Sequence, residues 1–110
     1  MTLPLNVDFR TCDWSAVAET ERPGESGCAY WKTQQYGDVR VRMVRYTPGY
    51  LADHWCRRGH VLLVLTGTLN TELQDGTTVT LTAGQSYVVA DDASSHRSRT
   101  TTGASLFIVD

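Results

Sequence analysis

The chain has 110 residues, of which 41% are hydrophobic, and ten basic against twelve acidic side chains give it a formal net charge of −2. This length suits a single domain. Such a domain buries about two-thirds of the surface that its unfolded chain exposes and can fold without disulfide bonds or structural metals. Charges of both signs are intermixed, so the sequence offers no long basic stripe for nucleic acid or an anionic membrane. We therefore expect the protein to bind neither nucleic acid nor a membrane.

The apolar runs and the cysteines predict a cytoplasmic protein. The longest apolar run, Val61 to Leu65, is far too short to span a bilayer. Residues 1–9 lack the basic start and apolar centre of a signal peptide. Cys12, Cys28 and Cys56 are an odd number without dense spacing, which favours reduced thiols.

In chain order, residues 1–26 predict an N-terminal arm with little regular structure, and residues 27–110 predict one β-barrel domain. Within the domain, short segments rich in β-branched residues are separated by turn signals, a pattern typical of strands. The expected strands are residues 27–35, 39–47, 53–56, 60–66, 68–73, 77–82, 86–90, 95–100 and 105–109. Short strands at turn spacing, with no convincing long helix, favour an all-β sandwich or barrel.

The segment 39–47 has the most regular pattern. It alternates apolar residues with arginines, as a half-buried strand does, before Pro48-Gly49 ends it. The alternating residues are Val39, Arg40, Val41, Arg42 and Met43.

Candidate metal ligands gather between Gly49 and Gly67. His54 and Cys56 are two residues apart, so on an extended strand both side chains would point to one face. His60 follows a turn-like segment and begins an apolar run, so a hairpin would bring all three together. His96 completes the three histidines of the chain and follows another turn-like segment, from which a strand would return it to the same place.

The positions Gly49, His54, Cys56, His60 and Gly67 resemble the first cupin motif. In that motif a glycine precedes a His-x-His pair, followed by a glutamate after three or four residues and a glycine after six more. Here three residues separate Cys56 from His60, and six separate His60 from Gly67. Cys56 replaces the second histidine, His60 replaces the glutamate, and the first spacer has four residues where five are common.

The stretch from Gly84 to His96 resembles the second cupin motif, with Ala90 and Asp92 where proline and glycine are usual. The signature Asp53-His54-Trp55-Cys56 resembles that of a small group of single-domain cupins named for a DHCW motif, a group without a settled activity. The resemblance covers roughly residues 37–110. It implies an all-β, cupin-like double-stranded β-helix, that is, a jelly-roll barrel in a single domain.

The donor set indicates a transition metal. Neutral imidazole and thiolate suit zinc, copper, nickel or iron, whereas magnesium and calcium prefer oxygen ligands. We expect one ion inside the barrel at His54, Cys56, His60 and His96, with zinc preferred and iron, nickel or copper as alternatives. Free cysteine is also often a small buried hydrophobe, so a triad of the three histidines with the thiol nearby remains the other possibility.

Two classes of function follow from the ligand count. Four protein ligands would close the site, as in a metal-dependent sensor, structural module or small-molecule binder. A three-histidine site with an open position would instead suit a small cupin enzyme of dioxygenase or isomerase type. Catalytic residues are not assigned, although Tyr46, Tyr50 and Tyr87 are candidates for a hydroxyl inside the barrel.

A homodimer is the expected assembly. Cupin-like barrels commonly pair their sheets or exchange N-terminal strands, and aromatic residues are enriched at interfaces. Trp14, Trp31 and Trp55 could supply such a surface.

Overall fold

The computed structural model describes residues 2–110, which fold as antiparallel β-structure with one short 3-10 turn. The elements are η1 (Trp14–Ala16), β1 (Thr20–Pro23), β2 (Cys28–Tyr36), β3 (Val39–Tyr46), β4 (His60–Leu73), β5 (Thr78–Thr82), β6 (Ser86–Val89), β7 (His96–Arg99) and β8 (Ala104–Val109). The prediction of an all-β, single-domain barrel is confirmed. In the described part of the chain, no helix has both the length and the apolar character needed to cross a membrane.

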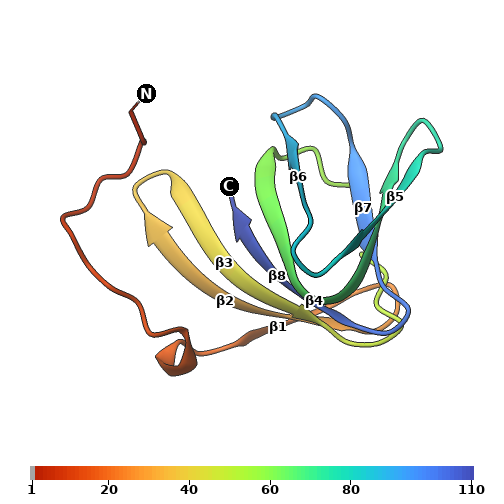
Figure 1. Ribbon diagram of the computed structural model, residues 1–110, viewed down its shortest axis with the longest axis horizontal. Coiled ribbons are helices and arrows are strands. Elements are labelled where there is room, and N and C mark those ends of the chain that lie inside the picture. The colour runs from red at the N-terminus through yellow and green to blue at the C-terminus, as the bar shows by residue number, and fades with distance from the viewer. Residues whose placement is uncertain (1) are drawn as a thin grey trace.

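The strands form two layers that share β4. The first layer has the order β1-β2-β3-β8-β4, and β6 pairs with the free side of the first half of β4. The second half of β4 pairs with β5 and β7 to make the other layer. Figure 1 shows these layers facing each other, with the C-terminus near the open end between them.

The long strand β4 connects the two layers, because its first half belongs to one and its second half to the other. Two separate strands, 60–66 and 68–73, were expected here, and that prediction was wrong because β4 continues through Gly67 as one strand. Gly67 has a φ of +79°, and a Cβ there would collide with the carbonyl oxygen of Gly103. A register shift between Val64 and Thr66 accompanies the turn of the strand.

The N-terminal segment combines irregular chain with one edge strand. Residues 2–19 carry only η1, which Asp13 caps by accepting a hydrogen bond from the Ser15 backbone N–H at 3.0 Å. Residues 20–23 then form β1 and pair with β2. The division of the chain into an arm and a barrel at residue 26 stays a prediction.

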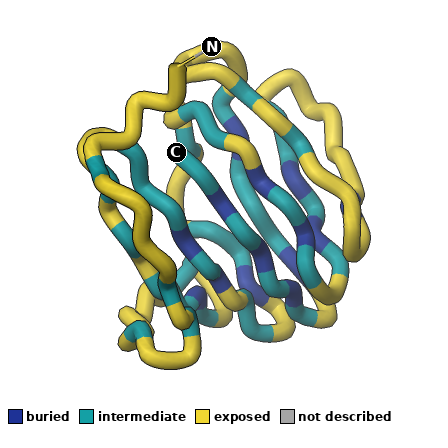
Figure 2. Tube along the Cα trace, turned by 60° about the vertical axis from the view of Figure 1, so that its left-hand side comes forward, coloured by how far each residue is buried: buried dark blue, intermediate teal, exposed yellow. Residues whose placement is uncertain are grey.

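The core lies between the two layers. Figure 2 shows its buried positions following the central strands. In β8, for example, Ala104, Leu106 and Ile108 are buried and alternate with half-buried residues, as expected for a strand with one face on the core. The most deeply buried large side chains are Leu62, Val64, Leu69 and Leu106. This packing holds the ends of β4, β7 and β8 around a small cavity.

Candidate metal centre

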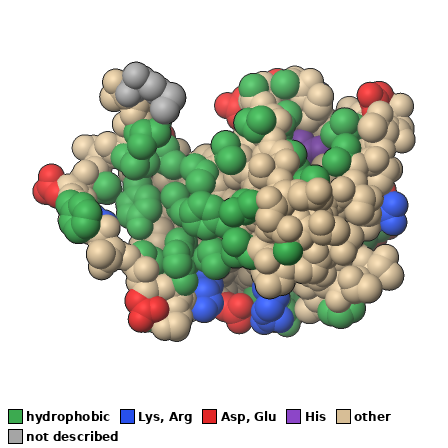
Figure 3. Space-filling model, viewed as in Figure 1, with side chains coloured by type: hydrophobic (Ala, Val, Ile, Leu, Met, Phe, Trp, Pro, Cys, Tyr) green, Lys and Arg blue, Asp and Glu red, His purple; other side chains and the backbone are tan. Residues whose placement is uncertain are grey.

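Three of the four predicted ligands come together at one end of the barrel. The ligand atoms of Cys56, His60 and His96 all lie within 4.8 Å of one another. His60 is the first residue of β4 and His96 the first of β7, and both side chains are buried or nearly so. Cys56 comes from the loop before β4. In Figure 3, histidine surface is visible in a hollow at the upper edge of the molecule.

The backbone ties Cys56 to His96. The Cys56 N–H donates to the His96 carbonyl at 2.7 Å, and the His96 N–H donates to the Cys56 carbonyl at 3.0 Å. The expected strand over residues 53–56 is absent, because this isolated bridge is the only strand-like pairing in it. Hydrogen bonding to His96 lowers the pKa of the Cys56 thiol, and the same contact raises the pKa of the His96 imidazole. Both shifts favour a thiolate here.

The two buried imidazoles meet edge to face. His60 Nε2 lies 3.0 Å from His96 Nε2, with the rings at 81°. His96 Nδ1 lies 2.9 Å from the Ser94 carbonyl oxygen, which can only accept, so His96 Nδ1 carries a proton. In neutral His96 the lone pair is therefore on Nε2 and points at His60.

The two ring nitrogens of His60 differ in their surroundings. His60 Nδ1 is buried without a hydrogen-bond partner and lies 3.6 Å from Asp110 Oδ2. When His60 carries its proton on Nδ1, its Nε2 can accept from the Tyr87 hydroxyl at 2.8 Å and also faces the Nε2 lone pair of neutral His96. A cation between the two Nε2 atoms would bind both lone pairs. The residues therefore fit a transition-metal ion, whose nitrogen ligands bind at about 2 Å.

His54 stands apart from this group. Its side chain is 73% exposed, and its Nδ1 lies 2.6 Å from Asp53 Oδ1. That hydrogen bond lowers the pKa of the Asp53 carboxyl. His54 nevertheless lines the same cavity as the three clustered residues. Because residues 53–56 do not form a strand, the rule that places alternate residues on one face does not apply to them.

A partly buried tyrosine completes the cluster. The Tyr87 hydroxyl is 2.8 Å from His60 Nε2. Burial raises the pKa of Tyr87 well above its usual value, so the hydroxyl stays protonated and can donate to His60. Tyr46 and Tyr50 stack on each other with ring centroids 4.2 Å apart, and both line the cavity. All three tyrosines considered from the sequence therefore lie at the site.

The cavity has a volume of about 130 Å³ and a second charged end that the sequence did not predict. Asp110 accepts two hydrogen bonds from Arg40, at 2.9 and 3.0 Å, and one from Arg42 at 2.9 Å. Burial alone would raise the pKa of Asp110, but His60 and the two arginines outweigh it and hold that pKa well below its usual range. The alternation of side chains along β3 could have indicated this end, since Arg40, Arg42 and Tyr46 lie on the same face of the strand.

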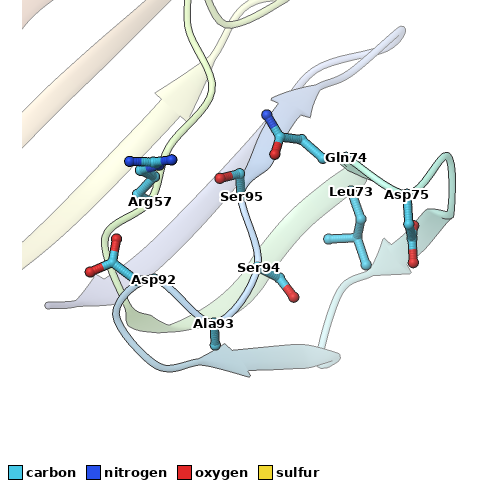
Figure 4. A pocket seen from close by; sticks show the side chains of 8 residues that line it. All are labelled: Arg57, Leu73, Gln74, Asp75, Asp92, Ala93, Ser94 and Ser95. Carbon is cyan, nitrogen blue, oxygen red and sulfur yellow. The ribbon is translucent and has the colours of Figure 1, made fainter.

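A larger and more open depression of about 580 Å³ lies beside the cluster. It is lined from the loop before β4, the β4–β5 turn and the β6–β7 turn, as Figure 4 shows. Ser94 links it to the cluster, since the Ser94 carbonyl oxygen lies 2.9 Å from His96 Nδ1. None of its lining residues is a histidine or a cysteine, so the metal chemistry belongs to the smaller cavity.

Solved structures share this fold. A cupin domain from Bordetella pertussis is 26% identical, with a TM-score of 0.59 over 83% of this chain and 96% of that one. A predicted oxalate decarboxylase from Thermotoga maritima has a TM-score of 0.77 at 15% identity, over 91% and 96% of the two chains. Ectoine synthase from P. lautus has a TM-score of 0.74 at 12% identity, over 92% and 76%.

By its fold, the chain is a single-domain protein of the cupin superfamily. No protein-family model matches the sequence, and no curated protein matches it either. The fold and the Cys56–His60–His96 cluster together support a metal-binding cupin. Identities of 12% and 15% carry the fold alone, so no activity follows from those two likenesses.

Proposed function

We propose that the protein is a metal-binding cupin that holds one transition-metal ion at Cys56, His60 and His96 and binds a small molecule in the adjoining cavity. The observation that carries this proposal is the position of the cluster. Three ligand atoms within 4.8 Å of one another border the same cavity, while His54 is turned toward Asp53. Three protein ligands leave a coordination position for a ligand from the cavity.

The donor set of one thiolate and two imidazoles suits zinc best, with iron, nickel or copper as alternatives. When bound, such an ion supplies Lewis acidity and lowers the pKa of the groups that coordinate it. The chain's own residues prepare the site. The Ser94 carbonyl fixes the tautomer of His96, and Asp110 lies on the Nδ1 side of His60, where it can play the same part.

The second candidate is a closed site in which His54 is the fourth ligand. The loop that carries His54 has no regular structure between Ala52 and Cys56, and His54 already lines the cavity. A closed Cys-His₃ set would favour a sensor or structural module, because no position remains for a substrate.

An enzymatic role needs the open form of the site. Solved structures with this fold carry the names of a predicted oxalate decarboxylase, an ectoine synthase and a sugar phosphate isomerase, so the fold supports several chemistries. The group available for proton transfer beside the cluster is the Tyr87 hydroxyl, 2.8 Å from His60 Nε2. A dioxygenase or isomerase of this kind remains the alternative function.

The homodimer and the cytoplasmic location also remain proposals. Trp31 is partly buried, lines the cavity and lies against three arginines, so it offers little surface to a second copy. Val61 and Val88 are better candidates, since they pair across β4 and β6 and are 51% and 76% exposed. If this sheet face joins two copies, Val88→Asp will shift the protein toward monomer in sedimentation velocity.

X-ray absorption of the zinc-loaded protein tests the proposal by counting its ligands. We expect one sulfur and two imidazole nitrogens, with a further light atom that exchanges when azide is added. A spectrum with one sulfur and three imidazoles that azide leaves unchanged would favour the closed module. A protein that takes up no zinc, cobalt, nickel, copper or iron would refute the metal centre.

A further inference from the structure

At the cavity beside the metal centre, the arginine side chains outnumber the carboxylates that pair with them. Three arginines line it, and the only carboxylate among the lining residues is Asp110. Arg97 pairs with Glu72, with a Nη2 to Oε2 distance of 3.0 Å, and Glu72 also pairs with Arg99 at 2.7 Å. Arg40 and Arg42 share Asp110 with the half-exposed Arg58, whose Nε lies 3.7 Å from Oδ2. The ion pairs of the described residues give neither Arg40 nor Arg42 a second carboxylate.

Arg42 is the arginine that most lacks a partner. It is only 6% exposed, and its guanidinium makes one hydrogen bond, from Nη2 to Asp110. Its Nε is buried and has no hydrogen-bond partner among the described residues. The guanidinium carbon lies 4.3 Å from the centre of the Trp31 ring, which attracts the charge without accepting its N–H groups. A buried charge that is only partly compensated favours binding of an anion.

The remaining walls of the cavity limit the size and character of that anion. A volume of about 130 Å³ holds only a few non-hydrogen atoms, since a liquid water takes about 30 Å³. Tyr46, Tyr50, Leu62 and Ile108 provide aromatic and aliphatic surface. A short apolar chain therefore fits the walls, and a single negative group fits the arginine end.

We infer that the cavity binds a short-chain monocarboxylate, with its carboxylate at Arg42 and Arg40 and its apolar chain against Tyr50 and Leu62. This inference rests on the proposed function for the role of the neighbouring metal centre. Arginine presents its N–H groups in a planar fork that matches a carboxylate. The apolar walls favour an anion with a hydrocarbon chain over a doubly charged phosphate, which has no apolar part.

The experiment follows the arginine N–H groups directly. The ¹⁵N-labelled full chain is titrated with propionate at constant ionic strength, in zinc-loaded and in chelator-treated form, and the arginine Nε–H signals are recorded. Arg42→Lys assigns the Arg42 signal by its disappearance. We expect propionate to shift that signal saturably in both forms, and the isosteric neutral propionamide to leave it in place.

Two variants test whether propionate binding depends on the Arg42 guanidinium in particular. Arg42→Lys should weaken propionate binding at least about tenfold, measured on the methyl signals of Leu62 and Ile108, because a charged bidentate contact is lost. Arg22→Gln is the matched control. Arg22 also stacks on Trp31, at 4.7 Å, but does not line the cavity, so this variant should bind as the wild type does.

A second variant keeps the test valid if Arg42→Lys does not fold. Ala52 lines the cavity, and Ala52→Leu fills it while both arginines remain, so propionate binding should be lost. Equal binding of propionamide, tighter binding of inorganic phosphate, or unchanged propionate binding in Ala52→Leu would each overturn the inference. Propionate binding without metal uptake would refute the metal centre alone, and zinc uptake without propionate binding would refute the carboxylate site alone.

Discussion

The two ends of the cavity differ in how far apart in the sequence their residues lie. The metal end takes Cys56 and His60 from positions only four apart in the chain, and His96 from the end of a second motif. The arginine end takes Arg40 and Arg42 from β3 and joins them to Asp110, 68 or more residues away, through the pairing of β3 with β8. Metal ligands can thus be read from spacing, whereas the charged pair depends on topology.

The largest expected effect is on stability at the arginine end. Asp110→Asn leaves Arg40 and Arg42 without a counter-charge at a side chain that is 1% exposed, so we expect a loss of about 3–5 kcal/mol in the free energy of unfolding. Urea denaturation at neutral pH measures it. A loss below 1 kcal/mol would show that solvent already compensates the two arginines.

The sign of the pH dependence follows from the lowered pKa of Asp110. A carboxyl with a depressed folded-state pKa contributes stability above its unfolded pKa of about 3.9, and that stability is lost as the pH falls toward the folded value. The stability difference between wild type and Asp110→Asn should therefore narrow below about pH 4. A difference that widens on acidification would contradict the assignment.

The β3 strand shows why the arginine end was missed. Alternation of Val39, Val41 and Met43 with the arginines predicted the strand, and the structure contains it. Alternation alone does not say which face points inward. In the structure Arg42 is buried and Arg40 lines the cavity, because the hydrogen bonds to Asp110 and the contacts with Trp31 hold their guanidinium groups there.

The ligands of the metal end could be predicted from the sequence, although the local structure that carries them could not. The cupin-like spacing singled out His54, Cys56, His60 and His96, of which the last three have their ligand atoms within 4.8 Å of one another. The hairpin that was expected to join them is not how they meet. Cys56 reaches the site through its backbone bridge to His96. Loop conformation of this kind follows from long-range contacts, which no local pattern contains.

The second-largest expected effect is on zinc affinity, and it distinguishes the three clustered ligands from His54. We expect His96→Ala to lower zinc affinity by about 100-fold or more, beyond the range seen when only a residue supporting a ligand is lost. His54→Ala should change it less than about tenfold, because its imidazole lies outside the group of three ligand atoms. Competition with a chromogenic chelator measures both. Equal losses in the two variants would establish a four-ligand site.

A third, spectroscopic prediction concerns the thiol. Co²⁺ bound at the site should show sulfur-to-metal charge-transfer absorption in the near ultraviolet, which disappears in Cys56→Ser and persists in Cys12→Ser and Cys28→Ser. The lowered pKa of Cys56 also predicts that the metal-free thiol is the most reactive of the three and that metal protects it. Stoichiometric cobalt without this band would place Cys56 outside the coordination sphere.

The smallest effect concerns Tyr87, where the expected sign is the opposite of the usual one. The hydroxyl lies 2.8 Å from His60 Nε2, the nitrogen that faces His96 and the cavity. In the metal-free protein the hydroxyl can donate to the lone pair of that nitrogen, and metal binding must displace this hydrogen bond. A hydrogen bond of this kind contributes about 0.5–1.5 kcal/mol, so Tyr87→Phe should raise zinc affinity by roughly two- to tenfold.

The same variant should destabilise the metal-free protein more than the zinc-loaded protein, because only the former loses the hydrogen bond. Thermal denaturation of both forms separates the two effects. Tyr46→Phe is the control, at a partly buried tyrosine of the same cavity that stacks on Tyr50. Weaker zinc binding in Tyr87→Phe would mean that the hydroxyl supports the bound ion. In that case Tyr87 would belong with Ser94 and Asp110 among the groups that orient the ligands.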